Sequence, residues 1–141
     1  MTHTLTIPGQ LPSLNEYIAA ERANRYKAAA MKRDAEQLIG LYARSQLRGV
    51  RFTGPVMMRY TWYEPNRRRA KDNIAFARKF IQDALVSAGV LQGDGWSCIG
   101  GFSDAFEVDG QNPHIEVHIC TENQKRLHKT FGNETERSET R

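Results

Sequence analysis

Segments that alternate apolar and polar residues are separated in this sequence by longer segments with a helical period, and this order constrains the fold most. Residues 4–8, 56–63 and 114–119 have the strand pattern, in which successive side chains point to opposite faces. Residues 13–47 and 73–88 instead repeat apolar residues every three or four positions. The order strand, helix, strand, helix and further strands predicts an α/β domain with a mixed β-sheet and helices packed on it.

The first helical segment is expected to run without interruption from about residue 13 to residue 47. Ser13 and Glu16 have the spacing of a capping box at its start, and Gly49 follows its end. Cations surround an apolar stripe at spacings of four, three and four residues. The stripe consists of Met31, Ala35, Leu38 and Tyr42.

The second helical segment is expected to span residues 73–88, with Asp72 as its N-cap and Gly89 after its end. Its predicted buried side consists of Ile74, Ala77, Ile81, Ala84, Leu85 and Ala88. Residues 96–108 follow as one broken strand or two short ones, because Gly100 and Gly101 interrupt them.

Length and composition favour a small protein of the cytoplasm. The 141 residues are enough for one domain with its own core, expected over residues 1–120, followed by a polar, solvated tail over residues 121–141. The two cysteines, Cys98 and Cys120, are too few for a disulfide framework and are interpreted as reduced thiols. No apolar stretch approaches the length of a membrane span, so no membrane partner is expected.

Charge is distributed unevenly along the chain. Residues 1–71 contain 13 Lys and Arg but only 5 Asp and Glu, whereas residues 72–141 contain 7 and 11. A basic half is suited to a polyanion, because Lys and Arg that neutralise phosphates release condensed counterions. Cations scattered over the surface for solubility explain the same composition equally well.

Several short motifs occur in an order that resembles one known family. They are Pro12 to Asn15, Asp72 to Ile74, Lys79 to Leu85, Ala88 to Leu91, Gly93 to Trp96 and Gly101 to Asp109. Each is common in turns, but the order and separations together resemble the RusA family of Holliday-junction resolvases, especially its prophage-borne branch. The resemblance covers most of residues 4–119.

The resemblance implies a homodimeric, magnesium-dependent endonuclease that resolves four-way DNA junctions in recombination and repair. The resemblance further implies that Asp72 and Asp94 are the magnesium ligands and that Lys79 assists catalysis. The residue types suit this chemistry, because a hard cation held by carboxylates can activate water and neutralise a developing oxyanion. Lys79 also lies two helical turns after Asp72, on nearly the same predicted face.

One position departs from the family pattern. The family has an aspartate two residues before the one at Asp72, where this chain has Ala70 followed by Lys71. A methyl group cannot bind magnesium, so three explanations are open. The chain binds junctions but cleaves them poorly or not at all; or Glu64, Asp83 or Asp104 completes the site; or Asp72 and Asp94 suffice.

The loop before Asp72 carries the cations expected to contact DNA. Arg67, Arg68, Arg69 and Lys71 would lie beside the metal site and bind backbone phosphates rather than bases.

A different class of function has weaker support. His114, Glu116 and His118 share one side of a predicted strand, as zinc ligands would, but no fourth ligand is identifiable. The preferred interpretation is a polar sheet face.

Overall fold

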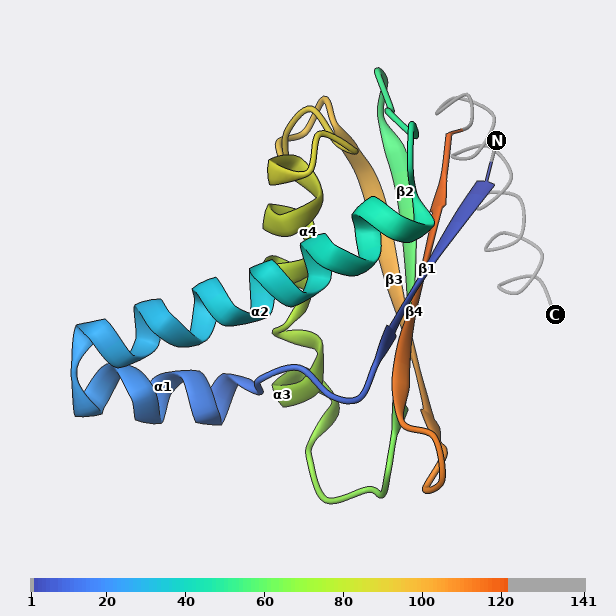
Figure 1. Cartoon of the computed structure of the whole chain (residues 1–141). Coiled ribbons are helices and arrows are strands. Elements are labelled where there is room, and N and C mark those ends of the chain that lie inside the picture. The colour runs from blue at the N-terminus through green and yellow to red at the C-terminus, as the bar shows by residue number, and fades with distance from the viewer. Residues whose placement is uncertain (1, 122–141) are drawn as a thin grey trace, which may run out of the picture.

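One four-stranded mixed sheet organises the chain in the computed structural model, which describes residues 2–121 (Figure 1). Its strands are β1 (Thr2–Pro8), β2 (Val56–Glu64), β3 (Ile99–Val108) and β4 (His114–Cys120), in the spatial order β1-β4-β2-β3. The central strand β4 is antiparallel to β1 and to β2, whereas β2 and β3 are parallel. The predicted α/β class with a mixed sheet is therefore confirmed.

Alternation along the strands gives the sheet one apolar and one polar face. Met58, Tyr60 and Trp62 of β2 are almost fully buried, and they pack with Leu5 and Ile7 of β1. Ile115, Val117 and Ile119 of β4 are equally buried, while the residues between them are half-exposed. The predicted pattern is confirmed because a period of two sends alternate side chains to opposite faces.

All the helices of residues 2–121 cover the apolar face, and none of them lies on the polar face (Figure 1). They are α1 (Leu14–Ala23), α2 (Arg25–Gln46), α3 (Lys71–Ala75) and α4 (Arg78–Ser87). Ile39 and Ala43 of α2 and Ile81 and Leu85 of α4 complete the core against the sheet.

The prediction of one unbroken helix over residues 13–47 is wrong. Asn24 has an extended backbone and separates α1 from α2, which folds back beside α1 (Figure 1). The Asn24 side chain accepts a hydrogen bond of 2.8 Å from the Lys27 N–H, and its own N–H donates to the Ala20 carbonyl at 3.1 Å. One residue thus ends the first helix and caps the second. The capping box of Ser13 and Glu16 is present as predicted.

The apolar stripe predicted on this segment is also displaced. Ala35 is buried as expected, but Leu38 is 40% exposed and Tyr42 only half-buried. Their neighbours Ile39 and Ala43 are buried instead. Because each helical residue is rotated by about 100° from the one before, a shift of one position turns the helix by more than a quarter of a circle.

The predicted helix over residues 73–88 is divided as well. It consists of α3 and α4 with a break at Phe76 and Ala77, where the N–H groups of Ala77 and Lys79 donate to carbonyls three residues back. Asp72 is not the N-cap, because Ala70 occupies that position without a capping side chain. Of the predicted buried side, every residue is buried except Ala88, which is half-buried.

Residues 99–108 form a single strand, and its glycines accommodate an irregularity. Val56 pairs with Ile99 but Met57 pairs with Gly101, so Gly100 is an extra residue on β3. A Cβ atom at Gly101 would lie 2.9 Å from the Met57 Cε, so a larger residue would require Met57 to move.

Two further expectations concern the surroundings of the domain. Within residues 2–121, no helix is long and apolar enough to cross a membrane. Apart from residue 121, the predicted tail lies outside the described residues.

The capping role of Asn24 leads to a stability prediction. In Asn24→Ala, the Lys27 N–H loses its acceptor, and we expect the free energy of unfolding in urea to fall by about 1 kcal/mol. Asn24→Asp keeps a side-chain acceptor at the same place and is the matched control. Equal unfolding midpoints for the two variants would contradict the assigned cap.

Candidate nucleic-acid interface

The predicted magnesium ligands, the predicted catalytic lysine and the predicted DNA-binding cations all lie on the segment between β2 and β3, residues 65–98. Because these strands are parallel, the chain must leave one end of β2 and return to the other before β3 begins. Glu64 pairs with Val108 and Val56 pairs with Ile99, which fixes the two ends. Asp72 therefore follows one end of β2, and Asp94 precedes β3 at the other end.

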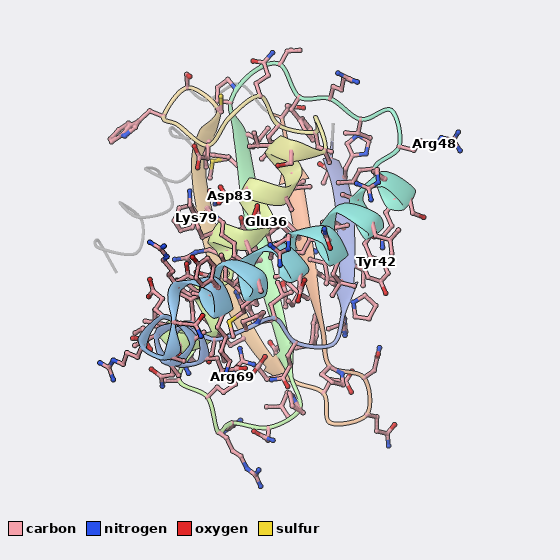
Figure 2. All side chains as sticks on the ribbon, turned by 60° about the vertical axis from the view of Figure 1, so that its left-hand side comes forward. Glu36, Tyr42, Arg48, Arg69, Lys79 and Asp83 are labelled. Carbon is pink, nitrogen blue, oxygen red and sulfur yellow. The ribbon has the colours of Figure 1, made fainter. Side chains whose placement is uncertain are left out.

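Lys79 and Asp94 are brought into direct contact. The Lys79 Nζ donates to the Asp94 Oδ2 at 2.9 Å and lies 3.1 Å from the Asp83 Oδ1. The second oxygen of Asp83 is 3.4 Å from the Nζ of Lys32 on α2. A continuous network of alternating charge thus connects Lys32, Asp83, Lys79 and Asp94. Lys79 and Asp83 lie close together on α4 (Figure 2). The ion pair of Lys79 with Asp83 is the i, i+4 pair expected on one helix face.

This network stabilises the charged form of both partners. Hydrogen bonds to Asp94 and Asp83 raise the pKa of Lys79, so the amine stays protonated. The hydrogen bond and charge of Lys79 lower the pKa of Asp94 below its usual range, so the carboxylate stays ionised. The pair is therefore fully charged at neutral pH, with more than two-fifths of each side chain exposed to solvent.

Asp72 lies apart from this network, in a contact of its own. It is exposed, and its Oδ1 accepts the N–H of Asn73 at 3.0 Å. The Asn73 Oδ1 accepts the N–H of Asn15 at 2.8 Å, which fastens α3 to the start of α1. The two motifs that resemble RusA near the N-terminus and at residues 72–74 thus touch each other. Sequence reasoning gave Asn73 no role of its own, although both asparagines belonged to those motifs.

Ala70 lies in the wall of a cavity of about 640 Å³ between the loop and β3. The cavity is lined by Glu64, Asn66, Arg67, Arg69, Ala70, Lys71, Ile74, Phe106, Glu107 and Val108. The Lys71 Nζ lies 5.7 Å from the centre of the Phe106 ring. The position where the family pattern has an aspartate therefore shares its cavity with three cationic side chains, one aromatic ring and the carboxylates of Glu64 and Glu107.

The four loop cations do not have equal surroundings. Arg69 donates to the Leu11 carbonyl at 3.2 Å, and its Nε lies 3.5 Å from the carboxylate of the buried Glu64, so much of its charge is already used inside the protein. Arg67, Arg68 and Lys71 are exposed and form no ion pair within residues 2–121. These three remain available to an anion.

The carboxylates considered as replacements for the missing one are already bound to other groups. Glu64 contacts Arg69 and accepts from the Gln10 Nε2 at 3.0 Å. Asp83 is shared by two lysines, as described above. Asp104 pairs with Arg78 and accepts from the Trp62 Nε1 at 2.9 Å. Among the described residues, no group of three His, Cys, Asp or Glu side chains is arranged to hold a metal ion.

His114, Glu116 and His118 lie on the polar face of the sheet. Glu116 Oε2 is 3.0 Å from the His114 Nε2, and its Oε1 is 3.5 Å from the His118 Nε2. Tyr63 stacks on the His114 ring with centroids 4.2 Å apart. The carboxylate is shared between two imidazoles, which is the arrangement of a hydrogen-bonded polar face.

Comparison with known proteins found no family model and no curated protein that matches this chain. Its function is therefore inferred from the charges and contacts of residues 65–98 and from the motifs that resemble RusA.

Asn73 provides a test of how the loop is anchored. In Asn73→Ala, the Asn15 N–H loses its acceptor, and we expect a loss of about 1 kcal/mol in unfolding free energy. Faster hydrogen exchange at the Asn15 amide should accompany it. Asn73→Asp retains an oxygen acceptor, so its Asn15 amide should stay protected; exchange as fast as in the alanine variant would count against this anchor.

The contact of Lys79 with Asp94 predicts a change in titration. In Lys79→Met, we expect the pKa of Asp94 to rise toward its ordinary value of 3.8, measured by carboxyl NMR. The depressed pKa stabilises the fold above that value, and this contribution is lost as the pH falls through the pKa of the folded state. Lys32→Met is the matched control, because Lys32 contacts Asp83 but not Asp94. An unchanged Asp94 titration in Lys79→Met would contradict the assigned pair.

Proposed function

We propose that this chain binds four-way DNA junctions through the cations around Ala70, and that it is a RusA-like, magnesium-dependent endonuclease whose cleavage is weak because Ala70 leaves its metal site without one carboxylate. The observation that carries the proposal is that Arg67, Arg68 and Lys71, beside Ala70, are exposed and form no ion pair within residues 2–121. A metal site that has lost an acid and kept its cations retains affinity for phosphate.

The binding half of the proposal rests on charge that has no internal partner. Arg67, Arg68 and Lys71 are exposed, and each can release counterions when it neutralises a phosphate. Their long side chains contact backbone rather than base edges, so this loop supports binding by DNA shape more than by sequence. A junction offers such a loop phosphates from more than one strand within a short distance.

The proposed cleavage activity rests on the two predicted ligands that are present, Asp72 and Asp94, and on Lys79. Asp72 is exposed and free to bind a ligand through one oxygen, whereas Asp94 is held by Lys79. Lys79, kept protonated by two carboxylates, is positioned to neutralise negative charge that develops on a phosphate near Asp94. We propose a twofold dimer, because two symmetric incisions require two sites.

Restoring the carboxylate tests both halves in one experiment. Labelled four-way junctions are incubated with the unsubstituted chain or with Ala70→Asp, in magnesium or in EDTA. We expect both proteins to shift the junction, and only Ala70→Asp to cleave it efficiently, and only with magnesium. The gain should be at least about 100-fold, because even a group outside a metal's ligand set is worth roughly 10- to 100-fold.

A matched control separates metal binding from helix capping. Ala70 occupies the N-cap position of α3 without a capping side chain, so an aspartate there also stabilises the helix. Ala70→Asn caps equally well but adds no negative charge, and it should bind junctions without a gain in cleavage. Cleavage by Ala70→Asn equal to that of Ala70→Asp would refute the lost-ligand explanation. No preference of any variant for junctions over linear duplex would refute the binding proposal.

A further inference from the structure

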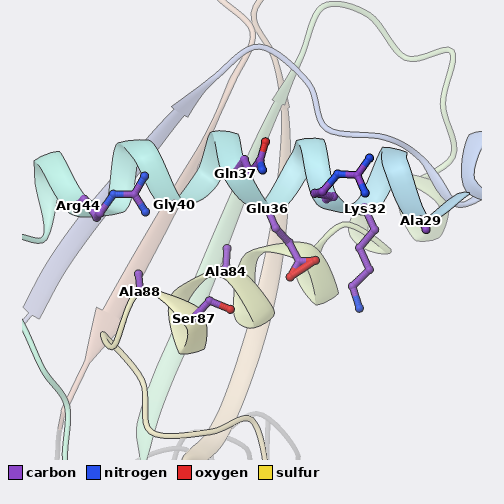
Figure 3. A pocket seen from close by; sticks show the side chains of 10 residues that line it. Ala29, Lys32, Glu36, Gln37, Gly40, Arg44, Ala84, Ser87 and Ala88 are labelled. Carbon is purple, nitrogen blue, oxygen red and sulfur yellow. The ribbon is translucent and has the colours of Figure 1, made fainter. Parts of the chain in front are cut away.

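A second basic surface runs along α2, outside the loop that carries Arg67 to Lys71. One cavity of about 420 Å³ lies between α2 and α4 (Figure 3). Another of about 320 Å³ lies where α2 ends. Arg44 and Ala88 line both, so the two cavities are adjacent. We call the two together the α2–α4 groove.

Small side chains open this groove and long cations border it. Gly40 of α2 faces Ala84 and Ala88 at the bottom, where larger residues would fill the space between the helices. The border residues are Lys32, Arg33, Arg44, Arg48 and Arg51, with Glu36 as the one carboxylate among the residues that line the two cavities. A long groove of this kind can bind an extended polymer, and its cationic border favours a polymer with negative charge.

Most of these cations have no internal partner. Arg33, Arg44, Arg48 and Arg51 are exposed and form no ion pair within the part of the chain that the structure describes. From Lys32 to its end at Gln46, α2 covers 14 helical steps, or roughly 21 Å at 1.5 Å per residue, and Arg48 lies just beyond it. This length corresponds to about six base pairs of duplex at 3.4 Å each.

The groove is connected to the candidate interface at one end. Lys32 lines the groove and pairs with Asp83, which pairs with Lys79, which in turn contacts Asp94. Arg48 lies at the far end of α2, away from Lys79 and Asp83 (Figure 2). A polyanion that contacts Lys79 can therefore continue toward Lys32 and the other cations of the groove.

We propose that the α2–α4 groove binds the phosphate backbone of one duplex arm of the DNA whose branch point is held at the Ala70 loop. This assignment rests on the proposed function and names the part of the substrate that the groove receives. It also accounts for the excess of cations over carboxylates among the residues that line the two cavities.

The test compares two variants that lose the same charge at different places. The groove variant is Arg33→Gln, Arg44→Gln, Arg48→Gln. The control is Arg22→Gln, Arg25→Gln, Lys27→Gln, which removes cations from the turn between α1 and α2. Affinity is measured over a range of salt concentrations for junctions with arms of about 20 base pairs and with hairpin-closed arms of about 6 base pairs. Thermal unfolding confirms that both variants fold.

We expect the groove variant to lose about three units from the slope of log K against log salt on the long arms, because each phosphate contact contributes about one. On the short arms the loss should be smaller, because an arm that starts at Ala70, outside the groove, must be longer than the groove to reach Arg48. The control should match the unsubstituted chain on both. Equal slopes for the groove variant and the control on the long arms would overturn the proposal.

Two further results separate this proposal from its alternatives. If the unsubstituted chain binds linear duplex and junction equally, and the groove variant loses slope on both, the groove assignment stands while the proposed junction function fails. If the groove variant keeps its DNA slope but loses binding to poly-glutamate that the control retains, the groove receives an acidic protein segment and the DNA assignment is overturned.

Discussion

The parallel pairing of β2 with β3 is the constraint on which the rest of the structure depends. It requires residues 65–98 to cross the apolar face of the sheet, and this crossover contains α3, α4 and every predicted site residue. Arg78 of α4 pairs with Asp104 of β3, which also accepts from the buried Trp62. Asp104 therefore connects the crossover with both strands that it joins. Lys79 follows Arg78 in the sequence, so this contact also restricts the position of Lys79.

Strand prediction succeeded because burial on one face imposes a strict period on the sequence. Ile115, Val117 and Ile119 carry that signal by themselves, and so do Met58, Tyr60 and Trp62. Helix boundaries were less accessible. Asn24 and Phe76 are compatible with a continuous helix, and only tertiary packing interrupts the chain there: α1 folds back on α2, and Phe76 packs between Tyr17 and Phe80. The buried side of α4 was still predicted correctly, because the break at Phe76 and Ala77 did not change which face of the helix is buried.

The sequence selected candidate residues but not the contacts that they make. Motifs in the sequence selected Asp72, Lys79 and Asp94, yet only the folded chain shows that Lys79 reaches Asp94 and that Asp72 does not share this contact. The bond between Asn15 and Asn73 joins residues 58 positions apart, a pairing that no local spacing reveals. The inward pairing of Arg69 with Glu64 was hidden for the same reason, because all four loop cations look alike in the sequence.

The hydrogen-bonded ion pair of Lys79 with Asp94 makes the lysine a counterion that is covalently part of the same chain. A tethered charge has an effective concentration set by the length of its tether rather than by the medium. Because both side chains are largely exposed, dissolved salt screens this pair and weakens it as the ionic strength rises. A divalent ion that binds there must displace an ammonium group, and the released ammonium group stays within reach of whatever anion arrives with the metal.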